Sequence, residues 1–166
     1  MKRSAAILGG DQRQVWLARL LLDDGCEVVT WGLEKGEGPN AVPLTQALEA
    51  GVLILPLPVI RGGKLTLPLT DTQLDAEQLW PKLRYDQLLL GGMTSELSPR
   101  LMADYGLTLL DYYDREETQT ANAVPTALPT GRSYFFWKEV LGGRPNPLFS
   151  AQFNQVCRTV TIDTYT

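Results

Sequence analysis

The residues best suited to chemistry stand together in one short stretch, Gly9-Gly10-Asp11-Gln12-Arg13-Gln14. Two glycines after an apolar run allow a tight turn with positive φ, and Asp11 precedes Gln14 by three residues, the spacing of a capping box at a helix start. Backbone N–H groups at a helix start, with an arginine beside them, suit a carboxylate or a phosphate. The stretch therefore predicts either a well-capped helix or a small anion-binding site.

Arg13 favours the second interpretation. A cation in the first helical turn faces the positive end of the helix dipole and costs about 0.3 to 1 kcal/mol there, whereas an anionic ligand would reverse the sign. On this ground we expect Arg13→Ala to weaken anion binding and to leave thermal stability unchanged or slightly higher.

A dinucleotide site is a minor alternative at this turn. Such a site needs G-x-G-x-x-G and an acidic residue about 20 positions later. The chain has G-G-D-Q-R-Q instead, and Glu34 is the residue that would have to replace the missing acid.

Several kinds of chemistry are excluded by composition. Histidine is absent, which removes Ser-His-Asp, Cys-His and imidazole–zinc sites. Cys26 and Cys157 lack C-x-x-C spacing and indicate neither a metal site nor a disulfide framework. A small hydrolase or isomerase with Asp11 or Asp111 as base is a weak alternative, because nothing places a second catalytic group near either carboxylate.

The overall composition is typical of one soluble domain. The chain has 166 residues, of which 44% are hydrophobic and 20% are charged. Its net charge is -4 and it has no basic run, so nucleic acid is not an expected partner. No apolar segment approaches the length of a membrane span, and the start Met-Lys-Arg-Ser leads directly into an expected strand, which together predict a cytoplasmic protein without a membrane partner.

The elements that must position the turn alternate along the chain. Short apolar runs predict strands at 4–8, 26–31, 52–55, 87–90 and 107–110. Helical spacing predicts helices at about 12–22, 44–51, 74–83 and 98–105, of which the third is short and interrupted at Pro81, and a Gly-Gly hairpin is expected at 59–66. This alternation predicts an α/β fold, a three-layer open and mostly parallel sheet of about five strands that is flavodoxin-like or Rossmann-like. Ligands of such sheets gather beyond the carboxyl ends of the strands.

Three motifs carry a family resemblance. They are the turn at 7–14, the strand exit Ile54-Leu55-Pro56-Leu57-Pro58, and Asp114-Arg115-Glu116-Glu117 followed by Asn122-Ala123-Val124-Pro125-Thr126. In order and spacing they resemble the N-terminal region of the A subunit of dipicolinate synthase, over about residues 3–127. The resemblance implies a flavodoxin-like domain at 1–127 in a sporulation enzyme that makes dipicolinic acid, oxidising a dihydrodipicolinate-type precursor with NADP alongside the B subunit.

The same resemblance implies a substrate-binding set, which comprises Gly10, Asp11, Arg13, Gln14, Asn122, Pro125 and Thr126. The implied ligand is a small dicarboxylate, which gives an arginine beside a helix start a physical reason to be there. No catalytic residue, metal site or bound cofactor is expected in this chain, since NADP is implied to bind a separate Rossmann domain that faces this one across a cleft.

Residues 128–166 do not match the family. They contain no G-x-G-x-x-G, so we expect this chain alone not to be a competent dehydrogenase. The aromatic cluster Tyr134-Phe135-Phe136-Trp137 supports an alternative function, a non-catalytic binding or assembly module that keeps the fold and self-associates or binds another protein.

Overall fold

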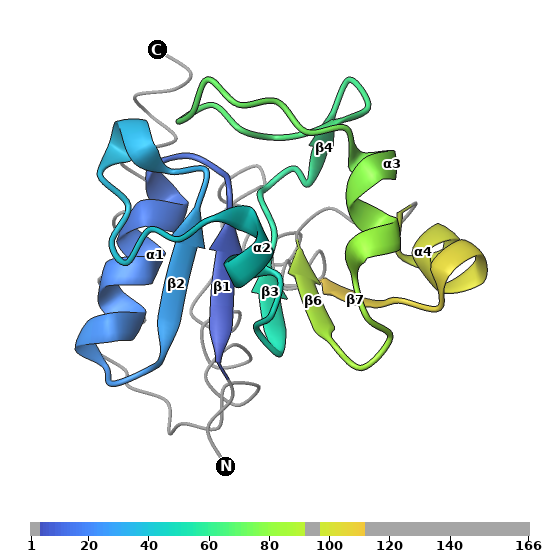
Figure 1. The fold of residues 1–166 in the computed structure, drawn as a ribbon, viewed down its shortest axis with the longest axis horizontal. Helices are drawn as coiled ribbons and strands as arrows, with labels where there is room; N and C mark the ends of the chain where they lie inside the picture. Colours follow the sequence, from blue (N-terminus) through green and yellow to red (C-terminus); the bar gives the residue numbers. More distant parts are fainter. Residues whose placement is uncertain (1–3, 92–96, 112–166) are drawn as a thin grey trace, which may run out of the picture.

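A five-stranded parallel sheet forms the centre of the computed structural model, which describes residues 4–91 and 97–111. Its strands are β1 (Ala5–Leu8), β2 (Val28–Trp31), β3 (Val52–Ile54), β6 (Leu88–Gly91) and β7 (Thr108–Asp111). They lie in the order β2-β1-β3-β6-β7, with Ile7 opposite both Thr30 and Ile54 (Figure 1). This is the flavodoxin-like order of a doubly wound sheet, and the predicted open α/β fold is confirmed.

Helices cover both faces of the sheet. Helix α1 (Gln12–Asp23) packs on one face, and α2 (Leu44–Ala47), α3 (Ala76–Leu79) and α4 (Leu97–Tyr105) pack on the other. Two short 3-10 turns, η1 (Glu34–Gly36) and η2 (Trp80–Lys82), and a hairpin of β4 (Ile60–Arg61) and β5 (Lys64–Leu65) complete the described elements. The strands read as continuous apolar runs because alternate side chains enter two different cores: Ala5 and Ile7 face α1, whereas Ala6 and Leu8 face the opposite layer.

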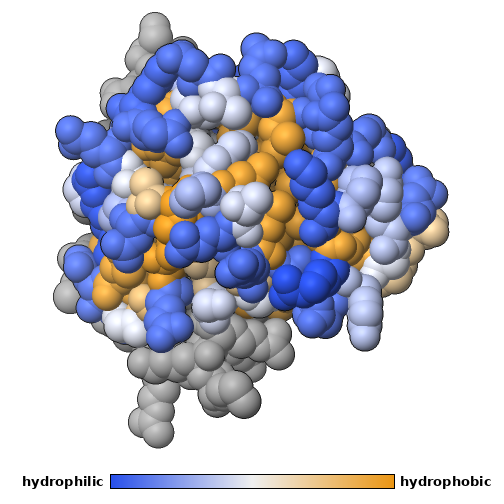
Figure 2. Space-filling model, in the orientation of Figure 1, coloured by the Kyte–Doolittle hydropathy of each residue, from blue (hydrophilic) through white to orange (hydrophobic). Residues whose placement is uncertain are grey.

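The larger core lies between the sheet and the layer of α2, α3 and α4. The indole of Trp80 is its largest fully buried side chain, and Leu53, Leu79 and Leu101 are also buried in it. Figure 2 shows apolar side chains in the middle of this face of the molecule with hydrophilic side chains around them. The side chains of Ala6, Leu8 and Leu53 on this face of the sheet are nevertheless fully buried.

Two expected helices differ from the observed ones. The helix expected at 44–51 is the single turn α2. The interruption expected at Pro81 is confirmed, because the short α3 is followed by η2, in which Pro81 cannot donate the hydrogen bond that would continue an α-helix. The sequence predicted Ser98 as the N-cap of the last helix, but α4 begins at Leu97. Gly106 ends that helix as predicted, with φ of 67°.

A small charged cluster joins α3 to α4 on the surface. The Tyr105 hydroxyl donates to Glu77 Oε2 at 2.9 Å, and the Arg100 guanidinium donates to Glu77 Oε1. The bond from Arg100, and then the one from Tyr105, hold the pKa of Glu77 below its ordinary value of 4.5. A carboxyl whose pKa is lowered by folding stabilises the fold above its unfolded-state pKa and loses that contribution as the pH falls through its folded-state pKa.

We expect Glu77→Gln to lower Tm slightly at neutral pH, since the pair is exposed and such pairs contribute little. The difference from wild type should begin to shrink as the pH falls below about 4.5, where the unfolded-state carboxyl starts to bind protons, and should be lost once the pH is below the lowered pKa of the folded-state Glu77 carboxyl. Thermal unfolding followed at a series of pH values checks this. A Tm difference that stays constant from neutral to acidic pH would show that the charge of Glu77 is not what holds the two helices.

Candidate functional site

The glycine turn lies at the carboxyl end of β1 and leads directly into α1. Gly9 and Gly10 have φ of 71° and 105°, a region that side chains other than glycine rarely adopt. Asp11 is the N-cap of α1, and its carboxylate accepts from the Arg13 N–H at 2.9 Å, while Gln14 Oε1 accepts from the Asp11 N–H at 2.9 Å. The predicted capping box is therefore confirmed, and the Gln14 side chain that completes it is buried.

The Arg13 side chain is engaged within the turn. Its Nε and Nη2 donate to the Asp11 carboxylate at 3.0 and 2.8 Å, and Nη2 also donates to the Leu57 carbonyl at 3.1 Å. The Arg13 side chain is 11% exposed and that of Asp11 is 27% exposed. Arg13 thus ties the start of α1 to the exit of β3, where the Leu57–Pro58 peptide is cis.

This geometry corrects one expectation from the sequence. The negative charge that compensates Arg13 at the helix start is the carboxylate of the N-cap itself, so the dipole cost inferred for Arg13 is already offset without a ligand. Asp11 accepts hydrogen bonds from both the backbone and the side chain of Arg13. It is therefore a capping residue in a closed pair, which speaks against its use as a catalytic base.

A segment after the hairpin covers the turn. The hairpin consists of β4 (Ile60–Arg61) and β5 (Lys64–Leu65), joined by Gly62 and Gly63 as predicted, and residues 66–73, here called the strap, follow it across the carboxyl ends of β1 and β2. The Thr66 carbonyl accepts from the Gly10 N–H at 3.1 Å. Leu67 packs against Gly9 and Gly32, where added side chains would meet it. The strap therefore closes the turn from the side of the strand ends.

Lys35 holds the middle of the strap. Its N–H donates to the Leu69 carbonyl at 2.8 Å, and its Nζ pairs with Asp71 at 2.6 Å. Leu69 lies so close to Gly36 that a Cβ there would be 2.8 Å from its Cδ1. The loop after β2 and the strap are thus fitted to each other, although they come from distant parts of the sequence.

The turn does not fit the pyrophosphate of a dinucleotide. A Cβ added to Gly9 would overlap Leu67 Cδ2 and lie 3.0 Å from the Thr66 carbonyl oxygen, so the space that glycines leave open for phosphate in a nucleotide site is filled by the strap. The Gly10 N–H is used by Thr66, and the Glu34 carboxylate accepts from the Gly32 N–H at 3.2 Å. The N–H groups of Gly10 and Gly32 are thus engaged within the chain, and the strap closes the Gly9 side of the turn.

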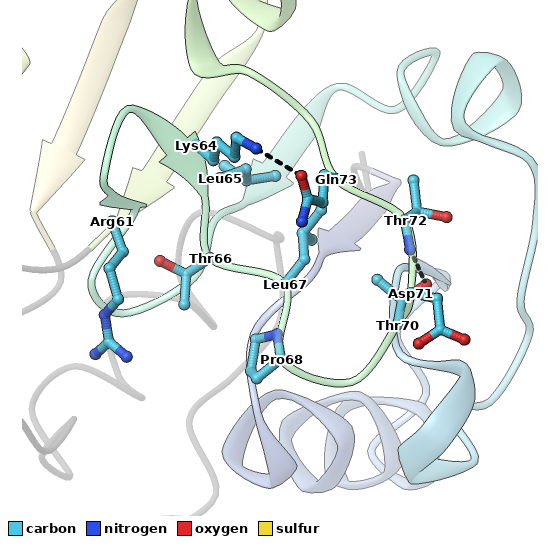
Figure 3. A pocket seen from close by; sticks show the side chains of 10 residues that line it. All are labelled: Arg61, Lys64, Leu65, Thr66, Leu67, Pro68, Thr70, Asp71, Thr72 and Gln73. Atoms are coloured by element: carbon cyan, nitrogen blue, oxygen red, sulfur yellow. Dashed lines mark hydrogen bonds between the residues drawn. The ribbon is translucent and has the colours of Figure 1, made fainter.

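An open hollow lies on the strap, beside the hairpin (Figure 3). It has a volume of about 420 Å³, within the range of small-molecule pockets. The lining is mostly polar: it includes Arg61, Lys64, Thr66, Thr70, Thr72 and Gln73, with Asp71 as its acidic residue. Lys64 Nζ donates to Gln73 Oε1 at 2.5 Å, and Figure 3 shows Arg61 turned away from both.

The structure brings together part of the predicted substrate-binding set. Gly10, Asp11, Arg13 and Gln14 form one compact turn, whereas Asn122, Pro125 and Thr126 lie outside the described residues, as do the expected domain boundary at 127 and the aromatic cluster at 134–137. Four residues at this edge were not predicted from the sequence, namely Thr66 and Leu67 on the turn and Arg61 and Lys64 in the hollow. Only the last pair had a local signal, namely two cations that flank a Gly-Gly turn.

The described residues contain neither a metal-binding cluster nor a membrane-spanning helix. No group of three or more His, Cys, Asp or Glu side chains is placed there to hold a metal ion. None of the helices in residues 4–91 and 97–111 has the length and apolar character needed to span a membrane.

A second hollow, of about 570 Å³, is lined by residues at the amino ends of β1 and β2, among them Ser4, Cys26 and Glu27. The strand-end edge with its turn, strap and hollow is the candidate site because it carries the predicted residues Gly10, Asp11, Arg13 and Gln14.

The strand order and the capped glycine turn define this chain as a Rossmann-like α/β domain of flavodoxin-like topology. It belongs to the family of the N-terminal domain of the dipicolinate synthase A subunit, and the model of that family matches residues 4–113. No curated protein matches the sequence significantly.

Two solved structures show the same fold. The dipicolinate synthase A chain from Bacillus subtilis superposes with a TM-score of 0.56 at 14% identity, over 87% of this chain and 59% of its own length. The A subunit of dipicolinate synthase from Bacillus halodurans gives 0.59 at 18% identity, over 74% of this chain and 45% of its own length. The chain therefore corresponds to about half of the length of these proteins.

Proposed function

We propose that this chain is the substrate-side domain of a dipicolinate synthase A subunit, in which it binds a small dicarboxylate at the carboxyl ends of its strands. The observation that carries the proposal is the family match over residues 4–113. In the complete protein, the reaction is the NADP-dependent oxidation of a dihydrodipicolinate-type precursor to dipicolinic acid during sporulation, in partnership with the B subunit.

The geometry supports a positioning role for the turn. Arg13 joins the turn to the exit of β3 through Leu57, and Gly10 joins it to the strap through Thr66. These bonds hold the turn, the exit of β3 and the strap in fixed positions relative to one another at the carboxyl ends of the strands. Precise orientation of a substrate needs such fixed positions. Within the proposed substrate-binding set, Gly10, Asp11, Arg13 and Gln14 then shape the floor of the site, and Asn122, Pro125 and Thr126 complete it.

Hydride transfer requires a bound nicotinamide, which would supply the oxidant. Because the strap fills the space above Gly9, we assign NADP to a separate nucleotide-binding domain of the complete protein and not to this turn. The contribution of the present residues is to bind and orient the dicarboxylate.

A non-catalytic binding or assembly module is the second candidate function. It is favoured by the closure of the turn, in which Asp11 and Arg13 are bound to each other. A module that keeps the fold needs such a well-capped helix but needs no ligand.

Thermal-shift titration distinguishes these functions. We expect dipicolinate to raise Tm by several degrees at about 100 times its Kd, because a ligand that binds only the folded state stabilises it by mass action. Benzoate at equal ionic strength is the control, since it offers one carboxylate instead of two. NADP should leave Tm unchanged.

Two outcomes would contradict the proposal. If dipicolinate has no more effect than benzoate, the assembly module becomes the better description. If NADP alone stabilises the chain, the interpretation of the glycine turn is wrong.

A further inference from the structure

Two cations of the hairpin lie directly opposite each other. Arg61 in β4 and Lys64 in β5 are register partners in the two-stranded antiparallel sheet, on either side of the Gly62-Gly63 turn. Side chains in such opposite positions have Cβ atoms about 4.5–5.5 Å apart, and like charges placed there destabilise the strand pair. In the unliganded chain the two side chains avoid this repulsion by pointing apart (Figure 3), and a bound anion would allow both cations to turn toward it.

The described residues do not supply that negative charge. Their ion pairs include neither Arg61 nor Lys64, and the Lys64 ammonium donates to Gln73, which is neutral. Asp71, the acidic residue of the hollow, pairs with Lys35. Asp75 forms a backbone bridge with Lys64, yet no ion pair joins their side chains. Two uncompensated positive charges thus face a polar hollow in a protein whose net charge is -4.

Arg13 cannot easily take the role of the carboxylate anchor. Its Nε and Nη2 already bind the Asp11 carboxylate, and its side chain is largely buried. Arg61 and Lys64 are exposed, and they stand only a few residues beyond the same β3 exit to which Arg13 is tied. At this edge of the sheet, Arg13 is already bound to Asp11, whereas the cations of the hairpin are available for a ligand.

We propose that Arg61 and Lys64 form a carboxylate-binding pair and that the hollow beside them takes a small dicarboxylate. Arg61 binds one carboxylate with its planar fork, and Lys64 exchanges Gln73 for the other. Thr70 and Thr72 line the same hollow and offer hydroxyl groups as neutral hydrogen-bond partners. The inference deepens the proposed function, on which it rests for the identity of the ligand.

The test is isothermal titration of the full chain with dipicolinate and, separately, with isophthalate, a benzene dicarboxylate of the same 1,3 geometry without the ring nitrogen. Wild type should bind dipicolinate, and Arg61→Gln combined with Lys64→Gln should weaken binding about tenfold or more, because two charge-assisted hydrogen bonds are lost. Lys82→Gln is the matched control, since it removes an exposed cation of η2 that does not line the hollow. Arg61→Lys combined with Lys64→Arg keeps both charges and should retain most of the affinity.

The unliganded variants give an independent readout. Removing either cation should leave Tm of the unliganded chain unchanged or slightly raised, because the opposed like charges are relieved. A fall in Tm would show that Arg61 and Lys64 hold the hairpin, and it would overturn the inference.

The titrations separate this inference from the proposed function. If wild type binds dipicolinate and the double glutamine variant binds it equally well, the ligand does not bind in the hollow, and the proposed function stands. If isophthalate binds through the pair and dipicolinate does not, the hollow is a dicarboxylate site, but the substrate in the proposed function is wrong. If neither compound binds to wild type, the inference fails.

Discussion

Replacing Gly9 by alanine should lower the free energy of unfolding by about 3 kcal/mol, the largest effect that we expect from a single methyl group in this protein. Part of the cost is the backbone, because a non-glycine residue at positive φ is strained by about 1 kcal/mol or more. The rest is overpacking, since the new Cβ would overlap Leu67 and approach the Thr66 carbonyl, and such insertions cost about 1 to 3 kcal/mol. Urea unfolding, which gives the free energy of unfolding by linear extrapolation, measures the sum.

A second glycine separates the two contributions. Gly62 has φ of 60°, but a Cβ there would meet nothing within 4 Å, so Gly62→Ala carries the backbone cost alone. Adding Leu67→Ala to Gly9→Ala should recover part of the loss, because it makes room for the methyl group. An equal loss in the free energy of unfolding for Gly9→Ala and Gly62→Ala would mean that the strap leaves room for a Cβ at position 9.

Replacing Arg13 by alanine should lower the free energy of unfolding by about 2 kcal/mol, which is the opposite of what the sequence led us to expect. The variant loses the fork on Asp11 and the bond to the Leu57 carbonyl, and hydrogen bonds to charged groups contribute about 1.5 to 3 kcal/mol each. Partial exposure of Asp11 reduces that loss of stability. Removing the cation of Arg13 from the positive end of the helix dipole also stabilises the variant by about 0.3 to 1 kcal/mol. Urea unfolding of the variant gives the value.

Two further variants show what Arg13 contributes. Arg19→Ala is the matched control on the same helix: that side chain lies over the Trp16 ring at 5.2 Å and makes one long bond to the Glu37 carbonyl, so its loss should cost well under 1 kcal/mol. Arg13→Lys keeps the charge and loses the planar fork, so it should recover little of the stability. Full recovery of stability in Arg13→Lys, or an Arg13→Ala variant as stable as wild type, would show that the hydrogen bonds of Arg13 between α1 and the β3 exit do not stabilise the fold.

Local signals in the sequence were sufficient for the architecture. The Asp11 and Gln14 spacing predicted the capping box, Gly106 predicted the end of α4, and the apolar runs predicted all five strands of the sheet. These features depend on neighbours within a few residues, which a single sequence displays directly.

The contacts that close the turn were not predictable in the same way. Thr66 and Leu67 reach Gly9 and Gly10 only because β3 lies beside β1, and no local pattern gives that placement. Without it, the N–H groups at the helix start look open to a ligand. The pair of Arg13 with Asp11 is a different case. An acidic N-cap two residues before an arginine is visible in the sequence, and it is a local signal for an ion pair between them.

The bond between Gly10 and Thr66 also sets an order of events in folding. The two residues are separated by β2, β3 and the hairpin, so the chain must close a long loop before this bond can form. Helix α1 with its capping box needs only local contacts and can form early, while its glycine turn is still open to water. The candidate ligand edge cannot reach its final shape until β3 has docked beside β1 and the residues beyond the hairpin have returned to cover it.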